Sequence, residues 1–184
     1  MTTGDGGRRM KCKLWSAIFF LALCVPATQG QSPDIFAAAR TNNAVQAQSL
    51  IDAKVDINQH DDRGYTPLIL ATYNQSPAVA EMLLSHGAAV DARDPMGRTA
   101  LMGASFQGDE QCVKLLLDHR ANINAADANG ATSLMYAVQF GRKSIIKLLI
   151  ASRADITLKD KRGFDATYLA EQTSDPEILA LLQH

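Results

Sequence analysis

Few side chains of this 184-residue chain are of the types that perform catalytic or metal chemistry, and their spacing does not bring them together. The histidines stand at positions 60, 86, 119 and 184, without the short spacings typical of metal ligands. Catalysis needs a nucleophile or an acid–base pair in a cleft that excludes water. We therefore expect no enzyme activity, no metal site and no cofactor.

Two other sets of residues leave alternatives open. Cys112 precedes Val113 in a leucine-rich segment, which favours a buried packing role over a reactive thiol. A regular series of aspartates could form a ladder of calcium sites, but each is expected to bond its own turn; they are Asp61, Asp94, Asp127 and Asp160.

Those aspartates belong to an internal repeat. The segments DDRGYTPLILA, DPMGRTALMGA, DANGATSLMYA and DKRGFDATYLA begin at 61, 94, 127 and 160, a constant period of 33 residues. Each has a glycine three places after its aspartate, at 64, 97, 130 and 163, and a leucine-rich segment follows each of the first three. Such units stack, because one unit alone leaves its apolar surface open on both sides.

The elements of one unit follow from its residues. A threonine at 66, 99 or 132 can cap a helix whose first position suits Pro67. Leu68 and Ala71 lie three apart, so the first helix has a narrow apolar face. After a connection near residues 75, 108 and 141, a second helix contains the leucine pairs at 83–84, 116–117 and 148–149. An extended segment at Val90, Ile123 or Ile156 then leads to the next turn.

These motifs resemble the ankyrin family, whose consensus runs D-x-x-G-x-T-P-L-H-x-A, then a leucine-rich helix, then G-A-D-V-N. The resemblance extends from about Pro33 to the C-terminus and implies an all-α repeat solenoid of five stacked helix-turn-helix units joined by β-hairpin loops. The first and last units act as caps, with Ser32 and Pro33 starting the first helix and Gln183 and His184 closing the stack.

The sequence departs from the family at two positions. The consensus histidine is replaced by Ile69, Met102, Met135 and Tyr168, which should loosen the link between repeats; the methionines are expected to fill core space rather than bind metal. The glycine that ends the second helix remains as Gly87 but is replaced by Lys54, Arg120 and Arg153. A left-handed backbone there costs about 1 kcal/mol relative to glycine. Tolerated surface variation is favoured over a functional basic ridge.

Residues 1–30 differ from the rest and are typical of a signal peptide. Four basic residues precede the twelve-residue apolar run from Leu14 to Val25, which is too short for a bilayer span of roughly 20 residues. Cleavage after Ala27 or Gly30 suits the small residues there, and Met10 is an alternative start. A twin-arginine signal fits poorly, as does lipidation at Cys24, which follows a leucine.

Cleavage would leave residues 31–184 as one ankyrin-repeat domain with 14 Lys and Arg against 18 Asp and Glu, a net charge of −4. Only Cys112 would remain, so no internal disulfide can form. Because the mature chain lacks a basic run, nucleic acid is excluded as a partner. We expect a soluble monomer with no membrane contact.

In the ankyrin family, ligands usually contact hairpin tips and the inner side of the first helices. The resemblance transfers that role to Asp62, Arg63, Tyr65, Tyr73, Asn74, Met96, Arg98, Phe106, Gln107, Asn129, Gln139, Phe140, Arg162 and Phe164. The aromatic rings at 73, 106 and 140 suggest an exposed binding stripe. The alternative is that these rings pack on the neighbouring first helix.

The predicted function is therefore that of a non-enzymatic, partner-binding protein of the bacterial periplasm. Resemblance to exported bacterial ankyrin-repeat proteins suggests an inhibitor or scaffold that masks a periplasmic enzyme such as a cell-wall hydrolase, or one that supports oxidative-stress defence alongside a catalase. A secreted effector that binds a host protein is the alternative.

Overall fold

The computed structural model describes residues 34–183, which form ten short helices in consecutive pairs. The predicted signal peptide, residues 31–33 and His184 lie outside the described residues. The first helices of the pairs are α1 (Ile35–Thr41), α3 (Pro67–Tyr73), α5 (Ala100–Gln107), α7 (Ser133–Gln139) and α9 (Ala166–Gln172). The second helices are α2 (Ala44–Asp52), α4 (Pro77–Ser85), α6 (Glu110–Asp118), α8 (Lys143–Ala151) and α10 (Pro176–Leu182).

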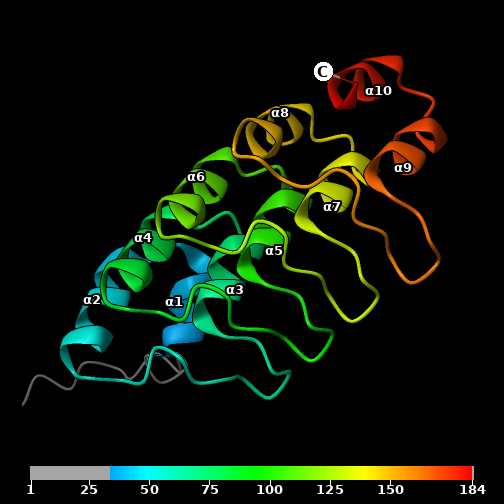
Figure 1. The fold of residues 1–184 in the computed structure, drawn as a ribbon. Helices are drawn as coiled ribbons and strands as arrows, with labels where there is room; N and C mark the ends of the chain where they lie inside the picture. The colour runs from blue at the N-terminus through cyan, green and yellow to red at the C-terminus, as the bar shows by residue number, and fades with distance from the viewer. Residues whose placement is uncertain (1–33, 184) are drawn as a thin grey trace, which may run out of the picture. The chain divides into compact units, whose positions relative to one another are not determined.

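The helices stack in two rows (Figure 1). Each first helix packs against the first helices before and after it, and the second helices form a parallel row. Four loops project beside the first-helix row: the first hairpin (residues 61–65), the second (94–98), the third (127–131) and the fourth (160–164). The predicted all-helical repeat solenoid is confirmed.

The core lies between the two rows and repeats along them. Leu68 and Ala71 are almost fully buried, as are their equivalents in α5 and α7. Leu83, Leu116 and Leu149 of the second helices have no exposed surface. The prediction that this apolar face is narrow is wrong, because residues 67–72 of α3 and 100–105 of α5 are all buried.

The helix starts agree with the predicted caps at two of three threonines. Thr66 Oγ1 accepts a hydrogen bond from the Ile69 amide at 3.3 Å, and Thr132 Oγ1 accepts from the Met135 amide at 3.4 Å. The prediction is wrong for Thr99, whose buried hydroxyl has no partner among the described residues. The backbones at 99 and 132 are equally extended, so the difference lies in how the side chain is turned.

The first helix also starts later than predicted. Its N-cap is Asp34, whose carboxylate accepts from the Phe36 amide at 3.0 Å, and the helix begins at Ile35. Asparagine and aspartate are as effective as serine at this position. The prediction that Ser32 and Pro33 start this helix is therefore wrong.

The ends of the second helices confirm the expected left-handed residues. Gly87 has φ 87°, and the residues that replace glycine have similar values: Lys54 59°, Arg120 63° and Arg153 67°. The same turn thus forms with and without glycine. At Lys54, Arg120 and Arg153 the backbone bears the strain that a positive φ imposes on a residue with a Cβ atom.

The segments beyond these ends are turns, so the prediction that Val90, Ile123 and Ile156 are extended is wrong. Amides of the following repeat unit are bonded by side chains of the preceding one: Ala89 N–H donates to Asn58 Oδ1 at 2.8 Å, and Asn122 N–H donates to Asp91 Oδ1 at 2.9 Å. These bonds tie the turn of each unit to the unit before it.

Each hairpin is closed by its aspartate and glycine. In the second hairpin, Asp94 N–H donates to the Arg98 carbonyl at 3.0 Å and Gly97 N–H donates to the Asp94 carbonyl at 2.8 Å. A Cβ atom on Gly97 would lie 2.9 Å from the Ala128 nitrogen, whereas one on Gly163 would meet no described atom within 4 Å. The predicted β-hairpins are tight turns here: within residues 34–183 the single β-bridge joins Ala126 and Thr132.

Successive hairpins are joined by backbone hydrogen bonds, with one exception. Ala128 N–H donates to the Met96 carbonyl and Lys161 N–H donates to the Asn129 carbonyl, each at 2.9 Å. At the corresponding place between the first two hairpins stands Pro95, which has no N–H. Side chains must therefore make that link.

No helix in residues 34–183 has the length and apolar character needed to cross a bilayer.

Candidate partner-binding face

Each hairpin aspartate is saturated by its own chain. In the second hairpin, Asp94 Oδ1 accepts from the Met96 and Arg98 amides at 2.9 Å each. The same pair of bonds recurs in the other three hairpins. The second oxygen, Oδ2, has a different partner in each: Arg40 for Asp61, Arg98 for Asp94, Tyr136 for Asp127 and Arg162 for Asp160. The prediction that each aspartate bonds its own turn is confirmed.

The described residues contain no cluster of three or more side chains suited to hold a metal ion. The calcium ladder considered from the sequence would have to displace bonds that each carboxylate already makes. The arrangement thus favours a structural role for the aspartates.

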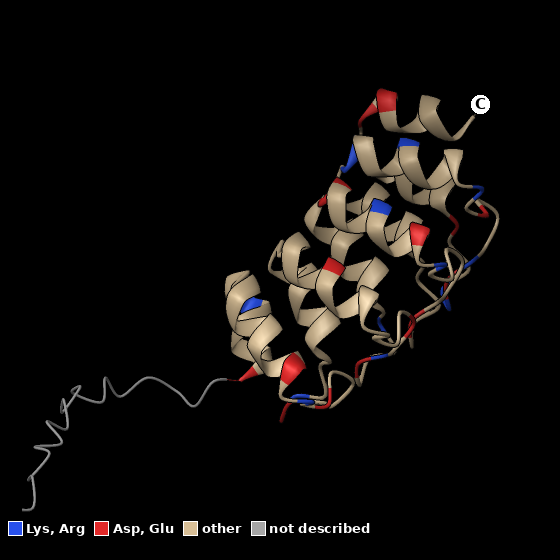
Figure 2. Cartoon of the chain, turned by 90° about the vertical axis from the view of Figure 1, so that its left-hand side faces the viewer, with Lys and Arg blue, Asp and Glu red and all other residues tan. Residues whose placement is uncertain are grey.

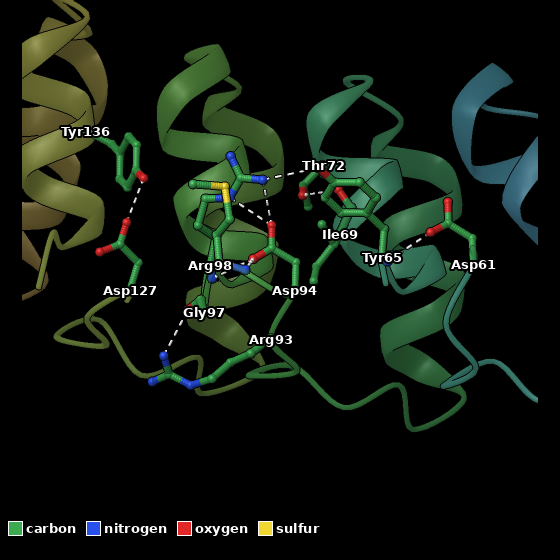
Figure 3. Close-up of polar contacts among 11 residues, drawn as sticks. Asp61, Tyr65, Ile69, Thr72, Arg93, Asp94, Gly97, Arg98, Asp127 and Tyr136 are labelled. Carbon is green, nitrogen blue, oxygen red and sulfur yellow. Dashed lines mark hydrogen bonds and ion pairs between the residues drawn. The ribbon is translucent and has the colours of Figure 1, made fainter. Parts of the chain in front are cut away.

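Arg98 links the first two hairpins where Pro95 prevents a backbone bond. Its Nε donates to Asp94 Oδ2 at 2.7 Å and its terminal NH2 group donates to the Tyr65 hydroxyl at 3.1 Å (Figure 3). The guanidinium also lies 5.6 Å from the centre of the Tyr73 ring. The loosening expected from loss of the consensus histidine stays a prediction.

Arg93 makes a second link between hairpins. One of its guanidinium nitrogens donates to the carbonyls of Gly97 at 2.8 Å and Ala126 at 2.6 Å. The side chain is exposed, so the bridge lies on the outside of the loops (Figure 3).

Four aromatic rings form a continuous row along the first helices. Ring centres are 6.4 Å apart for Tyr65 and Tyr73, 6.1 Å for Tyr73 and Phe106, and 4.4 Å for Phe106 and Phe140. Gly103 makes room for the row, since a Cβ there would lie 3.1 Å from the Tyr73 ring. Tyr73 therefore packs on the neighbouring helix, as the alternative interpretation predicted, while Phe140 keeps 43% of its surface exposed.

Two side chains donate hydrogen bonds to main-chain carbonyls of the preceding repeat, and one of them belongs to the predicted contact residue Gln107. Gln107 Nε2 donates to the Tyr73 carbonyl at 2.6 Å, and Arg142 Nε makes the equivalent bond to the Phe106 carbonyl at 2.9 Å. These side chains close the C-terminal ends of α3 and α5. Gln107 is thus committed to a bond between repeats.

The fourteen predicted contact residues divide by exposure. The half-buried ones are Tyr65, Tyr73, Arg98, Phe106, Gln107 and Phe164. The exposed ones are Asp62, Arg63, Asn74, Met96, Asn129, Gln139, Phe140 and Arg162. The exposed set lies on hairpin tips and at the C-terminal ends of first helices, and we call it the tip face. Its role in binding stays a prediction.

A groove of about 350 Å³ lies between the third and fourth hairpins. It brings together three residues of the tip face: Asn129, Gln139 and Arg162. Sequence reasoning missed its other members, among them Met135, Tyr136, Lys161 and Leu169. Lys161 could have been found, because it occupies the same tip position as Asp62, three hairpins further on. Leu169 carries no signal that separates it from a core leucine.

A second hollow adjoins the first hairpin, where Asp62 and Arg63 lie with Arg40 and His60. Its lining is mostly polar and charged. Asp61 is held there by Arg40, whose guanidinium approaches Oδ2 to 2.8 Å.

Comparison with known families agrees with the geometry. A family model described as ankyrin repeats (3 copies) matches residues 16–94 and 87–160, which together are more than half of the chain. The chain belongs to the ankyrin-repeat family. The family model describes three copies, so the count of five repeats, with capping units at both ends, stays a prediction. The search of curated proteins gave no match.

Within this ankyrin stack, the residues that replace the consensus histidine have two environments. Ile69, Met102 and Met135 are at most 2% exposed, so the predicted core-filling role is confirmed. Tyr168 is 40% exposed and stacks on Phe164, with ring centres 4.1 Å apart. The last unit thus presents an aromatic side chain at a position that the other units bury.

Cys112 packs in the core of the ankyrin stack. It has no exposed surface, and burial raises the pKa of its thiol, with the neighbouring Asp109 acting in the same direction. A neutral, inaccessible thiol is a poor nucleophile. The predicted packing role is therefore confirmed.

Proposed function

We propose that this chain acts in the bacterial periplasm as a non-enzymatic regulator, binding a partner protein through the tip face. Ankyrin repeats are protein–protein interaction modules, and the family is generally non-enzymatic. In the leading form of the proposal the partner is a periplasmic enzyme, such as a cell-wall hydrolase, whose surface the stack masks.

One observation carries the proposal: large apolar side chains are exposed on the same face as the polar hairpin tips. Met96 is 49% exposed and Phe140 is 43% exposed, although each lies beside a buried core. Apolar side chains surrounded by polar ones are typical of interface centres. The Met96 backbone is held by a bond to the next hairpin and the Phe140 backbone by the end of α7, so little ordering is needed on binding.

Affinity capture from a periplasmic extract tests the partner. We expect the purified chain to retain a hydrolase, and the double variant Met96→Ala, Phe140→Ala to lose it. Val45→Ala is the matched control, because Val45 is 83% exposed but lies on α2, in the second-helix row. Equal capture by both variants would show that Met96 and Phe140 are not part of the interface.

Support of oxidative-stress defence is the second candidate, in which the captured protein is a catalase. Recovery of neither enzyme class would count against both forms. The secreted-effector alternative differs in location, so cell fractionation separates it: protein found only in the medium would refute the periplasmic proposal.

A further inference from the structure

The groove between the third and fourth hairpins combines an apolar floor, exposed amides and exposed cations. We propose that it binds an acidic, extended peptide segment of the partner, with a carboxylate beside Lys161 and Arg162. This inference rests on the proposed function, since it names the chemistry of the segment that the tip face would hold.

The two carboxylates in the groove do not oppose an acidic ligand. Asp127 and Asp160 are 7% and 8% exposed, and both face their own turns. Asp127 Oδ2 accepts from the Tyr136 hydroxyl at 2.8 Å, and Asp160 Oδ2 accepts from the Arg162 Nε and NH2 groups at 2.9 and 2.7 Å. Both carboxylates are thus buried and hydrogen-bonded within their own repeat, and the charge of Asp160 is paired with Arg162.

The two cations of the groove, Lys161 and Arg162, are exposed to solvent instead of buried in their own turn. Lys161 is exposed and makes no ion pair or side-chain hydrogen bond within residues 34–183. The Arg162 side chain is 65% exposed although it is bonded to Asp160. A ligand therefore meets positive charge at the fourth hairpin, although the chain from residue 31 onward is acidic overall. Figure 2 shows how basic and acidic residues are distributed over the described helices and loops.

Contacts within the last repeat also hold the Arg162 side chain in place. Two hydrogen bonds to Asp160 fix the Arg162 guanidinium, which lies 4.9 Å from the centre of the Phe164 ring. Phe164 in turn stacks on Tyr168. An ordered cation loses little side-chain entropy when a carboxylate binds, which favours association.

The remaining lining suits a peptide backbone and one apolar side chain. Asn129 and Gln139 are exposed amides at the rim, each with a donor and an acceptor for a main chain. Leu169, which is half-buried, gives the space between the hairpins apolar surface, and the buried Met135 lies beneath it. A volume of about 350 Å³ holds a few residues of extended chain, not a folded element.

Titration of the ¹⁵N-labelled protein with a capped peptide, Glu-Ala-Leu-Ala-Glu, tests the inference by NMR. We expect saturable shifts at the amides of Gln139, Lys161 and Arg162, with weaker binding as salt screens the charges. The matched peptide Gln-Ala-Leu-Ala-Gln should bind more weakly, by up to about fivefold for each exposed ion pair that is lost. Equal binding of the two peptides would overturn the proposal.

Lys161→Gln should weaken binding of the acidic peptide about fivefold. Its fold should be retained, because only the Lys161 backbone is bonded to the third hairpin. Lys147→Gln is the control, an exposed lysine on α8. If both variants bind alike, or if free glutarate shifts the same amides as strongly as the peptide, the groove is not an acidic-peptide site.

The capture experiment keeps this inference separate from the proposed function. A partner that is lost with Phe140→Ala but retained by Lys161→Gln would leave the function standing and refute the acidic segment. A partner lost with Lys161→Gln alone would support the groove and refute the role of the apolar tip residues.

Discussion

At the residue scale, Arg120 shows how a repeat tolerates a poor side chain at a strained position. It has φ 63°, is exposed and makes no hydrogen bond or ion pair through its side chain within residues 34–183. Arg120→Gly should therefore raise the free energy of unfolding by about 1 kcal/mol. Thermal unfolding measures the gain.

Arg120→Ala is the control for that prediction, because alanine removes the long side chain but keeps the strain of a positive φ. An equal gain in both variants would place the cost of Arg120 in its side chain and not in its backbone.

The glycines of the hairpins are needed to different degrees. Gly97→Ala should destabilise the stack by more than about 1 kcal/mol, because it adds a contact of 2.9 Å with the Ala128 nitrogen to the strain of a positive φ. Gly163→Ala carries only the strain, since nothing lies within 4 Å. Urea unfolding of the two variants separates the cost of the contact with Ala128 from the cost of a positive φ. Equal decreases in the free energy of unfolding would show that the neighbouring hairpin shifts to relieve the contact.

At the scale of elements, Tyr136 ties the third hairpin to α7. Tyr136→Phe removes the hydroxyl that donates to Asp127 Oδ2 and leaves a buried carboxylate oxygen without its partner, which should cost about 2 kcal/mol. Denaturant unfolding measures the loss.

Tyr168→Phe is the matched control, since the Tyr168 hydroxyl makes no hydrogen bond within residues 34–183. It should change stability by less than about 0.5 kcal/mol. Equal effects of the two substitutions would mean that the Tyr136 bond contributes nothing to the hairpin.

The elements themselves could be predicted because their signals lie within one repeat. The period, the leucine pairs and the left-handed position at Arg120 are local patterns with local causes. The failures concern the orientation of a side chain and the contacts between repeats. Thr99 has the sequence of a cap but turns its hydroxyl elsewhere, and the amide of Asn122 bonds Asp91 of the preceding unit.

The candidate site was predictable only in outline. Tip positions follow from the family pattern, so Met96 and Phe140 were found. Tyr73 was expected at the surface, but Gly103 on the next helix opens a place for its ring. The groove depends on how two hairpins are spaced, which no single repeat specifies.

At the scale of the whole molecule, stability should be lost at both ends of the pH range. Burial alone raises the pKa of Asp160, but bonds from the Phe164 amide and Arg162 lower it overall. A hydrogen bond with Lys143 lowers the pKa of Asp175. Because the folded values lie below the unfolded value of about 3.9, the stabilisation is present above that pH and is lost as the pH falls further.

The alkaline limit comes from tyrosines. Burial, followed by the bond to Asp127, raises the pKa of Tyr136, and burial also raises the pKa of Tyr73. Stability is then retained below about pH 10 and lost as the pH rises further. Melting temperature measured across pH should form a plateau, and Tyr136→Phe should weaken the alkaline decline. A decline unchanged in that variant would assign it to other groups.

The fourth hairpin has a consequence for the size of the recognition surface. It repeats the geometry of the three before it, yet Gly163 faces open space where its equivalents contact a following loop. The hairpin of a further 33-residue unit, encoded by a duplicated segment of 33 codons, could therefore pack there. The number of repeat units would then set how many ligand residues the protein contacts. Gain or loss of a repeat by gene duplication or deletion could therefore enlarge or reduce the recognition surface without changes to the existing repeats.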